Sequence, residues 1–272
     1  MEQRGMNERI RKLRALSVNT PPHIDMERAK IMTETYRREE GVLSVPQLRA
    51  QALKDYFSQK TLYLGEGELI VGEKGDSPQG APTFPELCCH SVEDMRLMNE
   101  RELIRFQVTP EDMALQEKVM IPFWKERCIR SRIFRQMTPE WKKAYECGIF
   151  TEFMEQRGPG HTVGSSKIYE KGLLDYQRDI QEAIDRLDFF QDPHALERKE
   201  ELEGMYTACE ALMILAARYS AYAHELAEQE GDAQRRAELL AQQKKEERDA
   251  LVAKITSGEL DIWSMFDSYV IL

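Results

Sequence analysis

One stretch of this sequence, residues 151–166, gathers side chains that could do chemistry. It places Phe153, Arg157 and His161 around a Gly158-Pro159-Gly160 turn. Such a turn forces the backbone through conformations that ordinary residues avoid, and a loop of this kind positions side chains. Histidine titrates closest to neutral pH, so His161 is the candidate acid–base group. The alternative is a helix–helix connection with a solvated His161, although loops carry function more often than cores do.

The five cysteines are a second possible source of chemistry. They lie at positions 88, 89, 128, 147 and 209, with no ladder of spaced pairs, so reduced thiols are expected. Cys88-Cys89-His90 could be part of a metal site. A zinc site needs about four ligands at spacings that vicinal cysteines do not provide. We therefore expect no metal and a packed, reduced pair in a buried loop.

Composition limits the class of protein. The 272 residues carry a formal net charge of -10, which argues against nucleic-acid binding because nucleic acid selects for clustered Lys and Arg. No apolar run approaches the roughly 20 residues of a membrane span. The first fifteen residues are charged throughout and lack the apolar core of a signal peptide. These features predict a soluble, cytoplasmic protein without membrane partners.

Most of the chain has helical spacing and helix-starting residues. Thr109-Pro110-Glu111 and Thr138-Pro139-Glu140 each combine an N-cap threonine, a proline and an acidic residue. They predict one helix running toward Trp124 and another ending at Gly148. Further helices are predicted over residues 7–16, 25–39 with Asp25 as N-cap, 44–58, 171–190, and from Asp192-Pro193 onward.

The predicted helix after Asp192 carries an apolar stripe with steps of three and four residues. Its members are Leu202, Met205, Cys209, Leu212, Ala216, Tyr219, Ala223 and Leu226. Such a stripe is usually core. We expect four members to be buried, namely Leu202, Cys209, Leu212 and Tyr219, and we expect Glu203 and Glu210 to be exposed.

One β-hairpin is predicted within this mainly α fold. Residues 61–64 and 68–71 are short and β-branched or apolar, and they flank Gly65-Glu66-Gly67. Residues 72–85 contain too much Gly and Pro for regular structure. We therefore expect an ordered loop from Gly72 to His90.

Three segments resemble the N-terminal part of the glycyl radical enzymes, the pyruvate formate-lyase superfamily. They are Glu68–Pro78, Gly80–His90 and Phe150–Val163, in that order and together with Trp141. The similarity runs from about Arg9 to about Leu240. It is greatest to the branch of the superfamily that dehydrates hydroxyproline.

The resemblance implies a fold, a reaction and a site. The fold would be the N-terminal helical region of an α/β barrel that is itself largely absent here. A radical S-adenosylmethionine activase would install a glycyl radical, which passes to a cysteine that abstracts hydrogen from trans-4-hydroxy-L-proline. Loss of water would then give a pyrroline-5-carboxylate. Phe153 would pack on the substrate ring and His161 would contact the leaving hydroxyl.

The two motifs that the superfamily uses for radical transfer do not occur in this sequence. They are Gly-Cys-Val-Glu, which carries the thiyl cysteine, and Arg-Val-x-Gly-Tyr, which carries the radical glycine. We expect a truncated or split product, with a partial pyruvate formate-lyase-type domain over residues 1–242 and a charged helical extension with a divergent tail over 243–272. It would bind no cofactor itself, be inactive alone, and need a complementary C-terminal polypeptide. The alternative is a non-catalytic helical protein that docks a partner chain or the activase.

Overall fold

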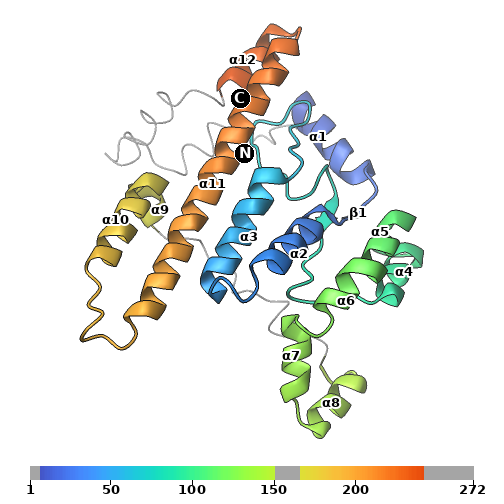
Figure 1. The fold of residues 1–272 in the computed structure, drawn as a ribbon. Coiled ribbons are helices and arrows are strands. Elements are labelled where there is room, and N and C mark those ends of the chain that lie inside the picture. The colour runs from blue at the N-terminus through green and yellow to red at the C-terminus, as the bar shows by residue number, and fades with distance from the viewer. Residues whose placement is uncertain (1–6, 151–165, 242–272) are drawn as a thin grey trace, which may run out of the picture. The chain divides into compact units, whose positions relative to one another are not determined.

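The described part of the protein is mainly helical, as the sequence predicts (Figure 1). The structure is a computed structural model, and it describes residues 7–150 and 166–241. These residues form two compact units. The first holds the described residues of Met1–Leu43 and Gln59–Gly160, and the second those of Ser44–Ser58 and His161–Leu272. The tail after residue 242 lies outside the described residues, so the domain boundary proposed there stays a prediction.

The first unit consists of short helices and two three-residue strands. Its elements are α1 (Glu8–Asn19), β1 (His23–Asp25), α2 (Glu27–Glu39), β2 (Gly80–Pro82), α4 (Val92–Glu100), α5 (Pro110–Leu115), a π-helical turn η1 (Gln116–Met120), α6 (Ile121–Trp124), α7 (Ile129–Gln136) and α8 (Pro139–Glu146). The predicted threonine caps are confirmed. Thr109 forms a capping box with Asp112, and the hydroxyl of Thr138 accepts from Trp141 N.

α2 begins one residue later than the predicted Asp25 N-cap implies. Asp25 belongs to β1, and Met26 takes the N-cap position without a side-chain hydrogen bond. The Asp25 carboxylate still accepts a hydrogen bond from Glu27 N at 2.8 Å. It therefore satisfies a free amide of the first turn from the residue before the N-cap. The helix ends before Gly41, whose φ of 84° suits glycine.

The two strands pair in parallel, and the pairing brings part of the predicted loop into a sheet. His23 lies opposite Gly80, Ile24 opposite Ala81 and Asp25 opposite Pro82. The expectation of no regular structure over residues 72–85 is therefore wrong at β2. The strand ends at Pro82, and Thr83 N donates to Asp25 O at 3.2 Å just beyond it.

The predicted hairpin over residues 61–71 is also wrong. The turn exists, because Glu68 N donates to Gly65 O at 3.2 Å and Gly67 has a φ of 80°. Neither flank forms a strand. Thr61 N and its hydroxyl donate instead to the Glu27 carboxylate at 2.9 and 2.8 Å, which binds the first flank to α2. An isolated two-stranded hairpin is marginal, so these contacts prevail.

The core of the first unit joins β1, α2, α4, η1 and α6. Its buried members are Ile24, Met26, Ala29, Met95, Val108, Met120 and Trp124. The indole nitrogen of Trp124 donates to Thr33 Oγ1 at 2.7 Å, so the buried ring is satisfied at its polar end.

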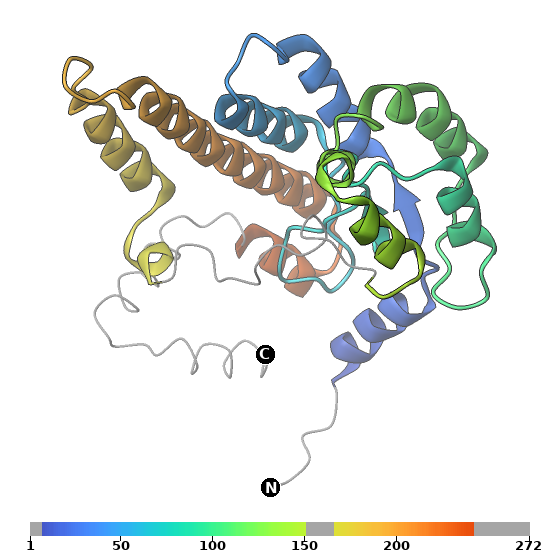
Figure 2. The same ribbon diagram turned by 90° about the horizontal axis from the view of Figure 1, so that it is seen from below.

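The second unit is built on one long helix. Its elements are α3 (Val45–Gln59), α9 (Lys167–Glu170), α10 (Leu173–Asp185), α11 (Ala195–Gln229) and α12 (Ala233–Ala241). α10 and α12 both pack on α11. α3 runs beside α11 (Figures 1 and 2), where Lys54 Nζ lies 2.7 Å from Glu210 Oε2 and Gln47 Nε2 lies 2.7 Å from Glu203 Oε2.

α11 does not bury the stripe that the sequence predicts. Tyr219 is buried as expected, but Leu202 and Cys209 are only partly buried and Leu212 is 44% exposed. Ala223, a further member of the stripe, is also buried, and the remaining buried positions carry small side chains, namely Ala195, Gly204, Ala211 and Ala227. Glu203 and Glu210, expected to be exposed, are half-buried against α3. Close approach of α3 favours small residues at the contact.

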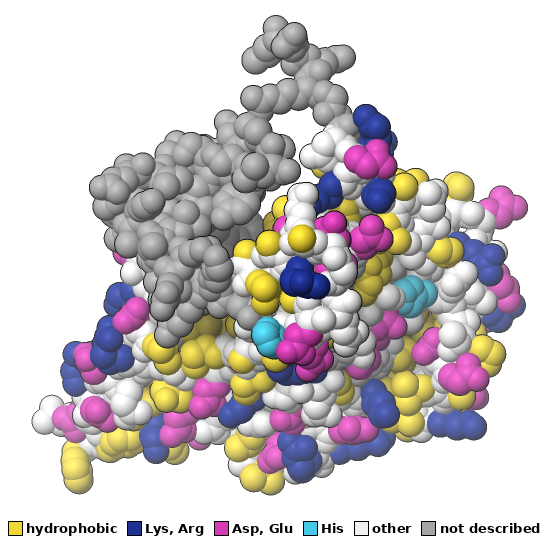
Figure 3. Space-filling view, turned by 90° about the horizontal axis from the view of Figure 1, so that it is seen from above, with side chains coloured by type: hydrophobic (Ala, Val, Ile, Leu, Met, Phe, Trp, Pro, Cys, Tyr) yellow, Lys and Arg dark blue, Asp and Glu magenta, His cyan; other side chains and the backbone are white. Residues whose placement is uncertain are grey.

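The described surface mixes charges of both signs. Acidic and basic side chains are interspersed over the face shown in Figure 3. Over residues 7–150 and 166–241, no helix combines the length and apolar character that crossing a membrane requires.

Candidate functional site

The two residues predicted to contact substrate, Phe153 and His161, lie outside the described residues. The structure instead describes the chain that leads to them. α8 ends at Glu146 with Cys147 as its C-cap, and Gly148 follows with a φ of 71°, a conformation that favours glycine. Ile149 and Phe150 complete this lead-in. Phe150 lies three residues before Phe153.

An aromatic cluster from α7 and α8 holds Phe150. The Trp141 and Phe150 ring centroids are 5.3 Å apart, and those of Tyr145 and Phe150 are 5.9 Å apart. Phe134 of α7 meets Tyr145 edge-on at 5.1 Å. Edge-to-face contacts of this kind add to the stabilisation from burial. The residue before the predicted substrate loop is therefore packed on α8 and, through Tyr145, connected to α7.

Arg130 connects this cluster to the Cys88 loop. Its guanidinium carbon lies 5.6 Å from the ring centroids of both Phe134 and Tyr145, within the range of cation–π attraction. One guanidinium nitrogen donates to the Tyr145 hydroxyl, and the other lies 3.3 Å from Cys88 Sγ. Sequence reasoning missed Arg130. The four-residue spacing to Phe134 on one helix was the available signal.

Cys88, Cys89 and His90 serve packing in the described structure. Burial raises the pKa of the Cys89 thiol to about 12, and the neighbouring Cys128 and Cys88 thiols add to this. Burial also lowers the pKa of His90. Both groups are therefore held in their neutral forms. Cys88 and Cys89 are half-buried rather than fully buried, and the described residues contain no metal-binding group of three or more ligands.

An ion pair fixes the preceding part of this loop to α2. Arg28 reaches the Glu86 carboxylate through both terminal nitrogens, and their side chains are only 13% and 17% exposed. The same guanidinium lies 3.9 Å from the Phe84 ring centroid and donates to Thr83 O at 3.2 Å. The segment that carries the family resemblance is thus ordered by residues outside it.

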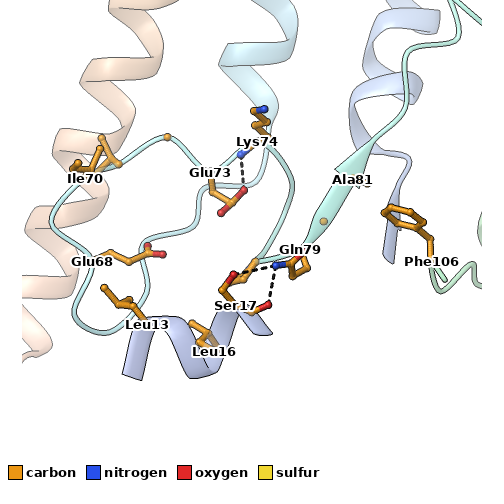
Figure 4. A pocket seen from close by; sticks show the side chains of 14 residues that line it. Leu13, Leu16, Ser17, Glu68, Ile70, Glu73, Lys74, Gln79, Ala81 and Phe106 are labelled. Carbon is orange, nitrogen blue, oxygen red and sulfur yellow. Dashed lines mark hydrogen bonds between the residues drawn. The ribbon is translucent and has the colours of Figure 1, made fainter. Parts of the chain in front are cut away.

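A pocket of about 690 Å³ lies between α1 and residues 68–81 (Figure 4). Leu13 and Leu16 of α1 line it together with Ile70, Ala81 and Phe106. Gln79 Nε2 donates to Ser17 O at 2.8 Å and ties the loop to α1 at the edge of the pocket.

The family model for pyruvate formate lyase-like proteins matches residues 6–250. The chain therefore belongs to the pyruvate formate lyase-like family. This confirms the family resemblance seen in the sequence.

Among curated relatives, the trans-4-hydroxy-L-proline dehydratase of Clostridioides difficile is 50% identical over 237 residues, which are 87% of this chain and 30% of that enzyme. The isethionate sulfite-lyase of Nitratidesulfovibrio vulgaris is 27% identical over 249 residues, again 87% of this chain and 30% of that enzyme. The chain thus spans about a third of the length of the curated relatives that it matches.

Solved structures of dehydratases have the same fold over most of this chain. The crystal structure of the Clostridioides difficile hydroxyproline dehydratase with trans-4-hydroxy-L-proline bound has a TM-score of 0.83 and 49% identity, over 89% of this chain and 30% of that one. The B12-independent glycerol dehydratase of Clostridium butyricum has a TM-score of 0.80 and 27% identity, over 89% of this chain and 31% of that one.

The residue patterns that the resemblance associates with the glycyl radical and the thiyl do not occur in the given sequence. None of the 15 glycines precedes a tyrosine, and none of the five cysteines follows a glycine. The positions that the resemblance assigns to the radical and to the thiyl therefore have no counterpart in this sequence.

Proposed function

We propose that this chain is the N-terminal portion of a cytoplasmic glycyl radical dehydratase that removes water from trans-4-hydroxy-L-proline to give a pyrroline-5-carboxylate. The identity to the hydroxyproline dehydratase carries the proposal. It is 50%, against 27% for the isethionate sulfite-lyase over a similar length. A difference of that size between two activities of one family favours the hydroxyproline branch.

Phe153 and His161 are the proposed substrate contacts. Phe153 would form an apolar wall against the ring, and His161 would protonate the departing hydroxyl, because hydroxide is a poor leaving group. The aromatic contacts of Phe150 support this assignment. They fix the chain immediately before the proposed wall.

The chain alone is proposed to be inactive. It has neither the Gly-Cys-Val-Glu motif nor the Arg-Val-x-Gly-Tyr motif, so the radical has no storage site and no route to substrate. Turnover would then require a complementary C-terminal polypeptide and a radical S-adenosylmethionine activase.

The test is an anaerobic reconstitution. We expect no dehydration of hydroxyproline and no glycine-centred paramagnetic resonance doublet when the chain is mixed with a matching activase and S-adenosylmethionine. Adding the remaining part of the Clostridioides difficile enzyme as a separate polypeptide should restore turnover. A doublet from the chain alone would refute incompleteness. A complex that forms without turnover would favour the non-catalytic binding role.

The same reconstitution tests the site. His161→Ala should lower turnover by about 10²–10⁴, the effect of losing a general acid. His224→Ala, on an exposed side chain of α11, is the matched control and should leave turnover unchanged. Equal activity of the two variants would remove His161 from the site.

A further inference from the structure

Three large apolar side chains stand in a row on the surface of the first unit. Leu69, Ile70 and Val71 are 37%, 85% and 38% exposed. Single exposed apolar residues are ordinary, but a consecutive run of them marks a surface that binds something. Two of the three are β-branched, which suits a strand.

The backbone of this segment is unpaired within the described structure. Among the residues described, no hydrogen bond involves the backbone N–H or C=O groups of residues 69–72. The residues on either side are fixed, since Glu68 N donates to Gly65 O at 3.2 Å and Lys60 Nζ donates to Glu73 O at 2.5 Å. Four consecutive residues thus present free donors and acceptors between two anchored ends. The segment is not itself a strand, since Ile70 is at a bend and Gly72 has a φ of 120°, but its free groups can pair with another strand.

The segment borders the pocket between it and α1. Figure 4 shows Ile70 and Glu68 on one side and Leu13 and Leu16 on the other. The hollow therefore offers apolar side chains beside the unpaired backbone of residues 70–72. This combination is what a peptide that adds as a strand requires.

We propose that residues 69–72 form a strand-addition site for an extended segment of the polypeptide that supplies the rest of the family fold. The occupant is inferred from the relatives, of whose length this chain covers about 30%. The inference rests on the proposed function, because the complementary polypeptide is part of that proposal. It also accounts for the strand signal in a segment that pairs with nothing in the described chain.

The test is co-purification. The full chain is co-expressed with the part of the Clostridioides difficile dehydratase that it does not match. We expect Ile70→Glu to reduce the recovered complex by about tenfold or more, as loss of an interface anchor does. Ile70→Pro should do the same by removing an amide. Val42→Glu, at an apolar residue of the same unit that is 73% exposed, is the control and should have no effect.

Amide hydrogen exchange gives a second readout that does not depend on the variants. Residues 69–72 should exchange fast in the chain alone and slowly in the complex. Absence of a complex, unprotected amides, or undiminished binding by both Ile70 variants would overturn the proposal. So would a homodimer of the chain that Ile70→Glu dissolves. Turnover of hydroxyproline is measured separately. A complex that forms without turnover contradicts only the proposed function. If turnover is seen and the Ile70→Glu variant still binds normally, only the strand-addition site is contradicted.

Discussion

Gly204 of α11 lies against Pro46 of α3 so closely that an added Cβ would stand 3.0 Å from the Pro46 carbonyl oxygen. Glycine costs helix stability relative to alanine, so its place inside α11 needs a compensating contact. The contact is this approach to the start of α3. Beside this contact, Gln47 Nε2 donates to Glu203 Oε2 at 2.7 Å.

Gly204→Val should therefore loosen α3 from α11. Extra atoms forced into a well-packed contact cost about 1–3 kcal/mol. Chemical denaturation of the full chain measures the loss. Gly231→Ala is the matched control, because an added Cβ there meets nothing within 4 Å, and it should leave stability unchanged or slightly raised. Equal stabilities of the two variants would contradict the observed α3 contact.

Arg28→Met should destabilise the first unit by about 3 kcal/mol, because it leaves the Glu86 carboxylate buried without its partner. The double variant Arg28→Met/Glu86→Leu should lose less, since no charge remains unpaired. Arg96→Met, at an exposed position of α4, is the control, and its melting temperature should match that of the unmodified chain. A double variant less stable than Arg28→Met would show that the Arg28–Glu86 ion pair is not the contact that fixes the Glu86 loop to α2.

Local signals predicted much of the helical framework. The Thr109 and Thr138 caps follow from rules that act within a few residues. The prediction of a hairpin was wrong because Thr61 N donates to the carboxylate of Glu27, 34 residues away. The predicted burial of the α11 stripe was wrong because α11 packs on Pro46 of α3 through Gly204. Both errors come from tertiary contacts that periodicity does not encode.

The site was less accessible to sequence reasoning. His161 and Phe153 were named from the resemblance and stay predictions. The residues that hold the approach to them, Arg130 and Tyr145, are common types without a motif. Their importance comes from the contact between α7 and α8. Only the fold brings Arg130 to Cys88 across 42 positions of sequence.

Stability should fall as pH falls through the histidine range. Burial lowers the pKa of His90 in the folded state below its ordinary value of 6.5. The unfolded chain therefore takes up the proton first, and the free energy of unfolding decreases until the pH is below the folded-state pKa. Urea titrations from about pH 7.5 to about pH 5.5 should show this decrease. His90→Gln should reduce the slope and His224→Gln should not. A steeper slope in His90→Gln would reverse the assignment.

The thiols should differ widely in reactivity. Alkylation requires the thiolate, and a pKa of about 12 leaves Cys89 almost wholly protonated near neutral pH. Cys147 is exposed, whereas Cys128 is buried. Iodoacetamide at about pH 8 should therefore label Cys147 first and leave Cys89 and Cys128 unmodified until the chain is unfolded in urea. Peptide mass spectrometry over time measures the order, with Cys147→Ser as the control for the fast phase. Rapid labelling of Cys89 in the folded chain would mean that its loop opens, and with it the Cys88 contact through which Arg130 connects α7 to that loop.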